Sequence, residues 1–246
     1  MGKELWLVTG GAGFIGSHIV DELVRRGERV RVLDDFSTGK RINTAGFPGS
    51  VELVRGTVAL PDSCARACAG VSVVLHQAAI RSVPKSMDKP QPSNEANVTG
   101  TLNMLVAAKA AGVRRFVYAS SSSAYGAAKI FPQREDMTPQ PLSPYAVSKL
   151  AGEHYARVWA RSFGLETVCL RYFNVFGPRQ DPESLYSAVV PKFMEAAFKG
   201  APLDVHWDGR QSRDFTYIAN VVEANLLAAR APAAGVVGEL FNVANG

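Results

Sequence analysis

The sequence predicts an α/β protein built on a doubly wound parallel sheet, with a smaller region after it. Three observations support this prediction. Short apolar runs alternate with helical patterns along most of the chain, a glycine-rich turn joins the first run to the first helical pattern, and an acidic residue ends the second run. Strands that alternate with helices in this way form parallel sheets covered by helices on both faces.

Each predicted strand is an apolar run of about strand length. These runs fall at 5–8, 29–34, 51–55, 71–75, 115–119, 167–170 and 238–244. Runs that are apolar on both faces are typical of buried parallel strands. Helical patterns with apolar residues every three or four positions fall near 15–26, 61–69, 93–111, 145–163, 186–199 and 218–230.

The first turn is rich in glycine. Gly11, Gly13 and Gly16 fit one spacing of the dinucleotide-binding fingerprint, and Gly10, Gly13 and Gly16 fit the variant with one more residue between the first two glycines. Glycine lets the strand turn sharply, lets the backbone approach a pyrophosphate, and lets the helix pack close to the strand. The pyrophosphate then lies at the N-terminus of the helix, where free N–H groups favour negative charge.

The acid at the end of the second strand is Asp34, about 20 residues beyond the glycines, where a carboxylate binds the adenosine ribose hydroxyls. Asp34 and Asp35 would repel a 2′-phosphate, so the predicted cofactor is NAD rather than NADP. For Asp35, a purely local role at the start of a turn is an equally good interpretation.

Composition excludes several classes of protein. The net charge of +5 comes from Lys and Arg scattered along the chain, which disfavours nucleic acid as a partner. The longest apolar runs fall far short of the ~20 residues that cross a bilayer, and the first of them belongs to the nucleotide fold, not to a secretory leader. The three cysteines and the absence of a His/Cys cluster indicate no metal site and a reducing cytoplasm.

After about residue 175 the alternation fades, and Pro178, Pro182, Pro191 and Pro202 punctuate shorter elements. We therefore expect a nucleotide-binding Rossmann domain at 1–175 and a substrate-binding region at 176–246. The last predicted strand is followed only by Asn245-Gly246, a turn signal, so we expect the substrate region to be incomplete at its C-terminal end.

A catalytic pair is predicted where Tyr145 and Lys149 stand four residues apart, on one face of a helix. A phenol with a pKa of ~10 is a poor base at neutral pH, but a neighbouring ammonium and a cationic nicotinamide favour the phenolate. The run Ser120-Ser121-Ser122-Ser123 follows a predicted strand, so its hydroxyls lie at the carboxyl edge of the sheet and can relay a proton.

With these motifs together, the sequence resembles the extended short-chain dehydrogenase/reductase family, and within it the nucleotide-sugar 4-epimerases. The matching stretches span nearly the whole chain and include the glycine turn, Asp34, His76-Gln77-Ala78-Ala79, Asn97-Val98-Thr99-Gly100-Thr101, Tyr145 with Lys149, Leu170-Arg171-Tyr172-Phe173-Asn174 and Asp208–Phe215. One departure is Gly56-Thr57, where the family usually has Gly-Asp against the adenine; Thr57 still offers a hydroxyl, and a weaker affinity for NAD is the expected consequence.

The resemblance implies roles for individual residues. Tyr145 is the catalytic base, Lys149 its partner and Ser121 the relay hydroxyl. The implied cofactor-binding residues are Gly10, Gly13, Phe14, Ile15, Gly16, Asp34, Asp35, Ser37, Gly39, Thr57, Val58, Gln77, Ala78, Ala79, Arg81, Asn97, Ser120, Tyr145, Lys149 and Tyr172. The implied substrate-binding residues are Arg81, Ser121, Ser122, Ser123, Tyr145, Asn174, Val189, Arg179 and Arg213, with Asn174 and Arg213 holding the nucleotide diphosphate.

The resemblance also implies the reaction. Related dehydratases carry an Asp-Glu pair where this chain has Ser122 and Ser123, and decarboxylating relatives carry a Glu there. The expected activity is therefore NAD-dependent C4 epimerisation of a UDP-hexose or UDP-N-acetylhexosamine. Two alternatives stay open: another nucleotide-sugar oxidoreductase (a UDP-glucuronate epimerase, a dehydratase or a reductase) and a non-catalytic protein that binds NAD or a nucleotide sugar. Apolar residues around the helical patterns 93–111 and 145–163 favour a symmetric homodimer, as in related epimerases.

Overall fold

A computed structural model describes residues 4–181, 189–203, 205 and 208–245. Its centre is a seven-stranded parallel sheet with strand order β3-β2-β1-β4-β5-β6-β9. The strands are β1 (Leu5–Thr9), β2 (Arg29–Asp34), β3 (Glu52–Arg55), β4 (Val73–His76), β5 (Arg115–Ser121), β6 (Glu166–Tyr172) and β9 (Leu240–Val243). The order reverses between β1 and β4, and ligands bind at such a reversal, outside the carboxyl ends of the strands.

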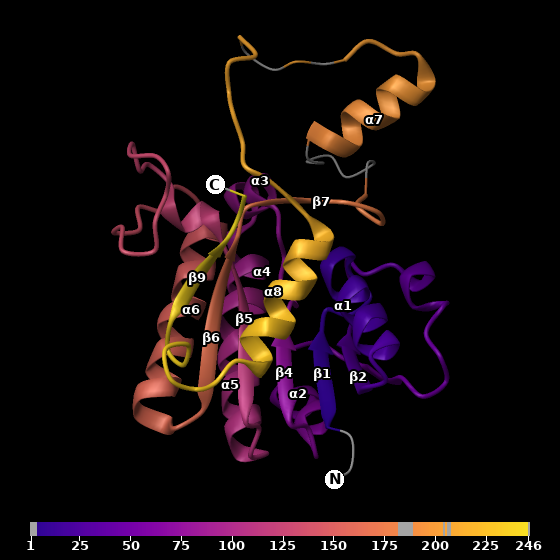
Figure 1. The fold of residues 1–246 in the computed structure, drawn as a ribbon, viewed down its shortest axis with the longest axis vertical. Helices are drawn as coiled ribbons and strands as arrows, with labels where there is room; N and C mark the ends of the chain where they lie inside the picture. The colour runs from indigo at the N-terminus through magenta and orange to yellow at the C-terminus, as the bar shows by residue number, and fades with distance from the viewer. Residues whose placement is uncertain (1–3, 182–188, 204, 206–207, 246) are drawn as a thin grey trace.

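Helices cover both faces of this sheet (Figure 1). They are α1 (Phe14–Arg25), α2 (Pro61–Cys68), α3 (Val83–Asp88), α4 (Pro90–Asn94), α5 (Gly100–Ala110), α6 (Pro144–Phe163), α7 (Val189–Lys199) and α8 (Ile218–Arg230). Side chains from α1 and α8 pack on one face of the sheet, where Trp6, Ile19 and Val221 are fully buried. Side chains from α2, α5 and α6 pack on the other face, around Met104 and Phe116. The two apolar cores confirm the doubly wound α/β fold predicted from the alternating pattern.

The predicted elements differ from the observed ones mainly at their boundaries. The pattern at 93–111 is divided into the end of α4, one π-helical turn at Glu95–Thr99, and α5. The first three residues of the predicted helix 186–199 lie outside the described residues. Helix α3 and the parallel pair β7 (Asn174–Phe176) and β8 (Phe215–Tyr217) had no counterpart in the prediction. Strands of three residues are too short to show a period in the sequence.

The elements after residue 175 lie in two different places in the molecule. Helix α8 packs against α1, and β9 pairs with β6, so both belong to the layers of the main sheet. Helix α7 stands apart at the top of Figure 1, and none of its residues is buried. The boundary at residue 175 therefore does not separate the sheet from the rest of the chain, and a distinct substrate region at 176–246 stays a prediction.

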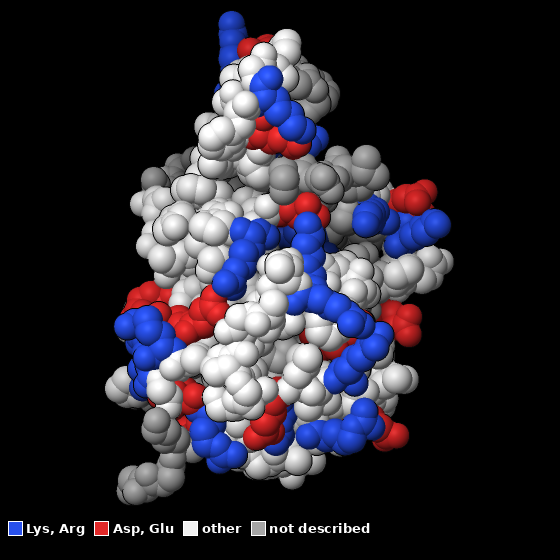
Figure 2. Space-filling view, turned by 90° about the vertical axis from the view of Figure 1, so that its right-hand side faces the viewer, with Lys and Arg blue, Asp and Glu red and all other residues white. Residues whose placement is uncertain are grey.

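Charged side chains are mixed on the face seen in Figure 2, where a run of basic groups is bordered by acidic ones. Several basic side chains at the end of α1 and on β2 are held in ion pairs, for example Arg26 with Glu223 and Arg31 with Glu52. Among the described residues, no group of His, Cys, Asp and Glu could hold a metal ion, and no helix is long and apolar enough to cross a bilayer.

Candidate active site

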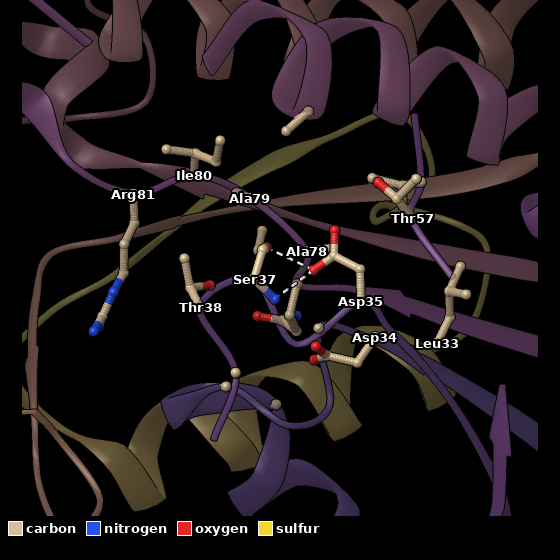
Figure 3. Close-up of a pocket in the computed structure, with 18 of the residues that line it drawn as sticks. Leu33, Asp34, Asp35, Ser37, Thr38, Thr57, Ala78, Ala79, Ile80 and Arg81 are labelled. Atoms are coloured by element: carbon tan, nitrogen blue, oxygen red, sulfur yellow. Dashed lines mark hydrogen bonds between the residues drawn. The ribbon is translucent and has the colours of Figure 1, made fainter. Parts of the chain in front are cut away.

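A cavity of about 660 Å³ opens at the carboxyl ends of β1, β2, β4 and β5 (Figure 3). It runs from Asp34 and Asp35 at one end to Tyr145 and Lys149 at the other. This is the position that the strand reversal predicts for a ligand, and the volume is in the usual range for a cofactor or small-molecule site.

The backbone of the glycine turn shows which glycine spacing is used. Gly10 has φ +68°, and a Cβ there would lie 2.9 Å from the Cα of Ala78. A Cβ on Gly16 would collide with the carbonyl oxygen of Gly10. Gly11 instead packs against Val32, whose Cγ1 would lie 2.7 Å from an added Cβ, and it does not line the cavity. The cradle is therefore formed by Gly10, Gly13 and Gly16.

Helix α1 begins directly at this cradle, with Gly13 as its N-cap residue. Phe14, Ile15 and Gly16, the first residues of the helix, line the cavity. Their backbone N–H groups have no partner within the helix, and the helix dipole adds partial positive charge at the same place. This end of α1 is built to bind an anion such as a pyrophosphate.

Asp34 is buried and accepts hydrogen bonds from the backbone N–H groups of Ala12 (2.9 Å) and Phe36 (2.8 Å). Burial raises the pKa of its carboxyl, and the two N–H groups act in the opposite direction. Asp34 thus holds the glycine turn in place and presents its carboxylate to the cavity.

Asp35 is exposed and binds both the N–H (2.8 Å) and the hydroxyl (2.6 Å) of Ser37, as Figure 3 shows. It therefore has the local turn role considered from the sequence and still lines the cavity. Thr57 also lines the cavity, and its hydroxyl accepts a hydrogen bond from the N–H of Ala59 at 3.3 Å.

At the other end of the cavity, Lys149 is buried and donates a hydrogen bond to the carbonyl oxygen of Ala119 at 2.8 Å. Burial lowers the pKa of Lys149 to about 8, and the carboxylate of Glu153 acts in the opposite direction. Removal from water raises the pKa of Tyr145, whereas a hydrogen bond with Ser121 and the positive charge of Arg81 lower it. The structure therefore brings together the three residues of the predicted catalytic set.

The serine run divides between two structures. Ser120 and Ser121 end β5, while Ser122 and Ser123 begin a short 3₁₀ helix at Ser122–Tyr125. The hydroxyl of Ser123 donates to the Ser121 hydroxyl at 2.9 Å. Ser121 is thereby held beside Tyr145, and Ser122 has no hydrogen bond to this pair.

All of the residues implied as cofactor-binding line the cavity, except Asn97. Asn97 lies behind the wall, where its side chain binds the N–H (2.8 Å) and the carbonyl oxygen (3.0 Å) of Ile80. It shapes the segment 77–81 rather than facing the cavity. Sequence reasoning missed further lining residues, namely Leu33, Thr38, Arg55, Gly56, Ala59, Leu60, Ile80, Pro92, Glu95, Ala96 and Ala119. Most of them adjoin a predicted residue at a strand end, a signal that was present in the sequence.

Fewer of the residues implied as substrate-binding line the cavity. Arg81 and Tyr145 line the cavity. The pairing of β7 with β8 brings Asn174 beside the segment of Arg213, and the Asn174 amide donates to the carbonyl oxygen of Asp214 at 3.1 Å. Arg213 is exposed and donates only to the neighbouring Ser212 carbonyl oxygen among the hydrogen bonds described.

Two further substrate candidates lie away from the cavity. Arg179 forms an ion pair with Asp21 on α1 at 2.6 Å, so its guanidinium is already partnered. Val189 is the first residue of α7 and is 39% exposed. The structure does not place either of these side chains at the cavity.

The residues present fit NAD. The glycine cradle and the start of α1 match a pyrophosphate, the buried carboxylate of Asp34 matches the ribose diol, and Tyr145 with Lys149 stands where the reacting ring would lie. A Cβ on Gly39 would come within 2.8 Å of an Asp34 carboxylate oxygen, so the wall beside the ribose site also requires glycine.

Comparison with known proteins agrees with this geometry. Residues 6–244 match the NAD dependent epimerase/dehydratase family. The chain is 38% identical to the UDP-glucose 4-epimerase of Mycolicibacterium smegmatis, over 98% of this chain and 77% of that protein. Among solved structures, the UDP-N-acetylglucosamine 4-epimerase of Methanobrevibacter ruminantium, in complex with UDP-N-acetylmuramic acid, superposes with a TM-score of 0.93 at 37% identity, over 99% of this chain and 77% of that chain. The UDP-glucose 4-epimerase of Thermus thermophilus, in complex with NAD, gives 0.86 at 40% identity, over 98% and 78%.

Relatives with other activities match as well. They include a UDP-N-acetyl-alpha-D-glucosaminuronate decarboxylase of Bacillus cytotoxicus, at 36% identity, and a dTDP-glucose 4,6-dehydratase of Streptomyces venezuelae, at 32% identity. These proteins share the fold and the nucleotide-sugar chemistry but differ in the reaction. The chain therefore belongs to the NAD dependent epimerase/dehydratase family, the extended short-chain dehydrogenases/reductases that act on nucleotide sugars, and its cofactor is NAD.

Proposed function

We propose that this protein catalyses C4 epimerisation of a UDP-hexose or a UDP-N-acetylhexosamine through a transient 4-keto sugar. The observation that carries the proposal is the grouping of Tyr145 and Lys149 at one end of the NAD cavity, with Ser121 hydrogen-bonded to Tyr145 and hydroxyl side chains at positions 122 and 123. The relatives named as 4-epimerases support the same assignment.

The chain's own residues supply the proton chemistry. Tyr145, as the phenolate, takes the proton of the C4 hydroxyl and later returns it to the alkoxide. The positive charge of Arg81 and a hydrogen bond with Ser121 lower the pKa of Tyr145. The ammonium of Lys149, one turn along α6, is expected to favour the phenolate in the same way. NAD, when bound, would supply the hydride acceptor and donor for the sugar C4. Net redox change is zero, so neither reductant nor oxidant is consumed.

The serine pair argues for epimerisation over the alternatives in the same family. Elimination of water needs a further acid and base near the sugar, and decarboxylating relatives use a Glu in this place. Ser122 and Ser123 cannot supply either function at neutral pH. Glu153, the buried carboxylate nearest in sequence to the catalytic pair, is bound by Ser120 and Arg171 and does not line the cavity.

We assign the uridine diphosphate to Asn174 and Arg213, two residues that do not line the cavity described above. The pairing of β7 with β8 brings their segments together, and an arginine fork matches phosphate oxygens well. Arg179 is a weaker candidate because binding a phosphate would compete with its ion pair to Asp21.

The test is turnover by the purified chain loaded with NAD. UDP-glucose and UDP-N-acetylglucosamine are each supplied, and the products are separated and identified by NMR. We expect the C4 epimer of at least one of them, with no net NADH and no deuterium incorporated from heavy water at C4. Net NADH would indicate a dehydrogenase or reductase, a 4-keto-6-deoxy product a dehydratase, and binding without turnover a non-catalytic protein. Each of these three results would contradict the proposal.

A further inference from the structure

A buried ion pair lies directly behind the catalytic end of the cavity. Glu153 on α6 and Arg171 on β6 are almost completely inaccessible, with side chains exposed by 4% and 2%. The guanidinium donates through Nε to one carboxylate oxygen at 2.8 Å and through Nη2 to the other at 2.7 Å. Neither residue lines the cavity, and neither has a part in the reaction described above.

The position of Glu153 relates it to the catalytic helix. Tyr145, Lys149 and Glu153 follow one another at intervals of four residues, so they lie along one face of α6. Glu153 is thus one turn from Lys149 on the same face of the helix, and its carboxylate raises the pKa of Lys149 against the effect of burial without a direct ion pair between them.

Glu153 also fixes the end of β5. The hydroxyl of Ser120 donates to a Glu153 carboxylate oxygen at 2.5 Å, while Lys149 donates to the carbonyl oxygen of Ala119. Two successive residues of β5 are therefore tied to two successive turns of α6. The next residue of β5 is Ser121, whose hydroxyl contacts Tyr145.

Stability alone does not account for such a pair. Desolvation of two charges offsets most of their attraction, and apolar replacements of a buried ion pair are often neutral or stabilising. Arg171 contacts the face of the Tyr125 ring, 4.4 Å from its centroid, and its Nη1 has no hydrogen-bond partner among the described residues. The pair therefore holds two opposite charges in a dry region behind the catalytic end of the cavity.

Apart from Tyr145, which is negative only as the phenolate, the other titratable groups packed around Lys149 do not supply a negative charge. Tyr118 on β5 presents its ring 5.2 Å from the ammonium, and its pKa is raised by burial, so it stays neutral. His76 on β4 is neutral because burial lowers its pKa to about 3. Arg171 on β6 is positive and opposes the carboxylate. Glu153 is therefore the carboxylate that balances Lys149 within the described residues packed around it.

We propose that Glu153 is a positioning residue for the reaction: its carboxylate keeps the Lys149 ammonium protonated and holds β5 in register with α6, while Arg171 sets how much of that negative charge Lys149 feels. The proposal rests on the proposed function, because it assigns Lys149 the task of favouring the Tyr145 phenolate.

The test uses two variants of the NAD-loaded protein that should shift the pKa of Lys149 in opposite directions. Glu153→Gln removes the negative charge and leaves Arg171 unbalanced, so Lys149 loses its proton at lower pH. Arg171→Gln frees the carboxylate to act on Lys149, so Lys149 keeps its proton to higher pH. We expect the alkaline limb of kcat against pH to move down by about 1 pH unit in the first variant and up in the second.

A structural role for the ion pair predicts a different result. Both variants break the same pair, so loss of packing would lower kcat in both without moving the limb in opposite directions. The proposal would be overturned if the alkaline limb of kcat against pH stays in place in both variants, or moves in the same direction in both. If Glu153→Gln does not fold, the upward shift in Arg171→Gln decides alone, and the neutral double variant Glu153→Gln/Arg171→Gln should show a limb between those of the single variants.

A second ion pair, between β5 and β6, serves as a control. Arg115 on β5 is buried and paired with Glu166 on β6 at 2.9 Å, but at the opposite ends of the strands from the cavity. Glu166→Gln should lower the unfolding temperature without moving the limb.

A readout independent of turnover separates this proposal from the proposed function. The Lys149 ammonium is titrated by NMR in protein labelled at lysine, with Lys149→Met to assign its signal. Opposite shifts of that titration in Glu153→Gln and Arg171→Gln support the role of Glu153 even if no UDP sugar is epimerised. Unchanged titration in both variants overturns it even if the epimerase activity is confirmed.

Discussion

The carboxylate of Asp34 accepts a hydrogen bond from the backbone N–H of Ala12 at 2.9 Å, and so joins the end of β2 to the glycine turn. The other carboxylate oxygen accepts from the N–H of Phe36 at 2.8 Å. One acid therefore shapes the pyrophosphate cradle and also carries the negative charge expected to bind the ribose hydroxyls. Any change at Asp34 alters both.

Asp34→Ala should weaken NAD binding by ~1–3 kcal/mol, because hydrogen bonds to a charged group are lost. The parent protein should bind NAD more tightly than NADP, since the carboxylate repels a 2′-phosphate. Calorimetry with both cofactors measures this. Asp35→Ala is the matched control, because Asp35 is exposed and bonds only to Ser37 among the interactions described, and its effect should be smaller. Equal affinity of the parent for NADP and NAD would contradict the role of Asp34.

Tyr145→Phe should lower the rate of epimerisation by at least ~10²-fold, with nucleotide-sugar binding nearly unchanged, because only the proton-transfer group is removed. Initial rates and calorimetry with the same UDP sugar separate the two effects. Tyr125 is not positioned to replace it, since Tyr125 is fully buried and its hydroxyl donates to Asn242 at 2.7 Å. A Tyr145→Phe variant as active as the parent would remove Tyr145 from the mechanism.

Arg213→Ala should raise KM for the UDP sugar steeply and leave the NAD content unchanged, because the cofactor's pyrophosphate belongs to the glycine turn. Arg213→Lys should restore only part of the affinity, since a point charge does not reproduce the guanidinium fork. Arg179→Ala serves as the comparison and should have a smaller effect, because Arg179 is paired with Asp21. UDP affinity of Arg213→Ala equal to that of the parent, measured by calorimetry, would exclude this residue from the diphosphate site.

Acid should destabilise the fold through His76. Its ring nitrogens lie 2.8 Å and 3.1 Å from the hydroxyls of Thr9 and Thr101, and burial lowers its pKa to about 3 from 6.5. The folded protein thus binds fewer protons than the unfolded chain between these values, so the stability is present above pH 6.5 and is lost as the pH falls towards 3. At pH 5 the expected loss relative to pH 8 is about 2 kcal/mol.

Urea unfolding at the two pH values measures this dependence. His76→Gln should be less stable than the parent at pH 8 but should lack this part of the pH dependence. The exposed His154 provides the control, since His154→Gln should keep the parent's dependence. A His76→Gln variant that loses as much stability as the parent between pH 8 and pH 5 would show that other groups cause the effect.

The protein should form a symmetric homodimer through α5 and α6. Val106 on α5 is 53% exposed, and Val147 on α6 has the same exposed fraction. Beside Val147 lies a groove of about 840 Å³ lined in part by Met87 and Leu142. Light scattering at micromolar concentration should give twice the monomer mass, and Val147→Glu should shift it towards the monomer. A monomeric mass for the parent would contradict the prediction.

The sequence by itself determined the local parts of the site. The glycine turn, Asp34 after β2, and the spacing of Tyr145 and Lys149 were readable because each depends on neighbouring residues and on the period of one strand or one helix. The same locality explains why nearly all of the predicted cofactor residues line one cavity: the carboxyl ends of parallel strands meet at one edge of the sheet.

Only the tertiary structure decided contacts between residues far apart in the chain. It selected Gly10 over Gly11 for the cradle, because Gly11 packs against Val32 of the next strand. In the structure, Asn97 lies behind the cavity wall and Arg179 is paired with Asp21, neither of which the sequence predicted. The pairing of Glu153 with Arg171 likewise has no local signal, since a buried ion pair is set by which helix covers which strand, and that is fixed by packing of the whole core.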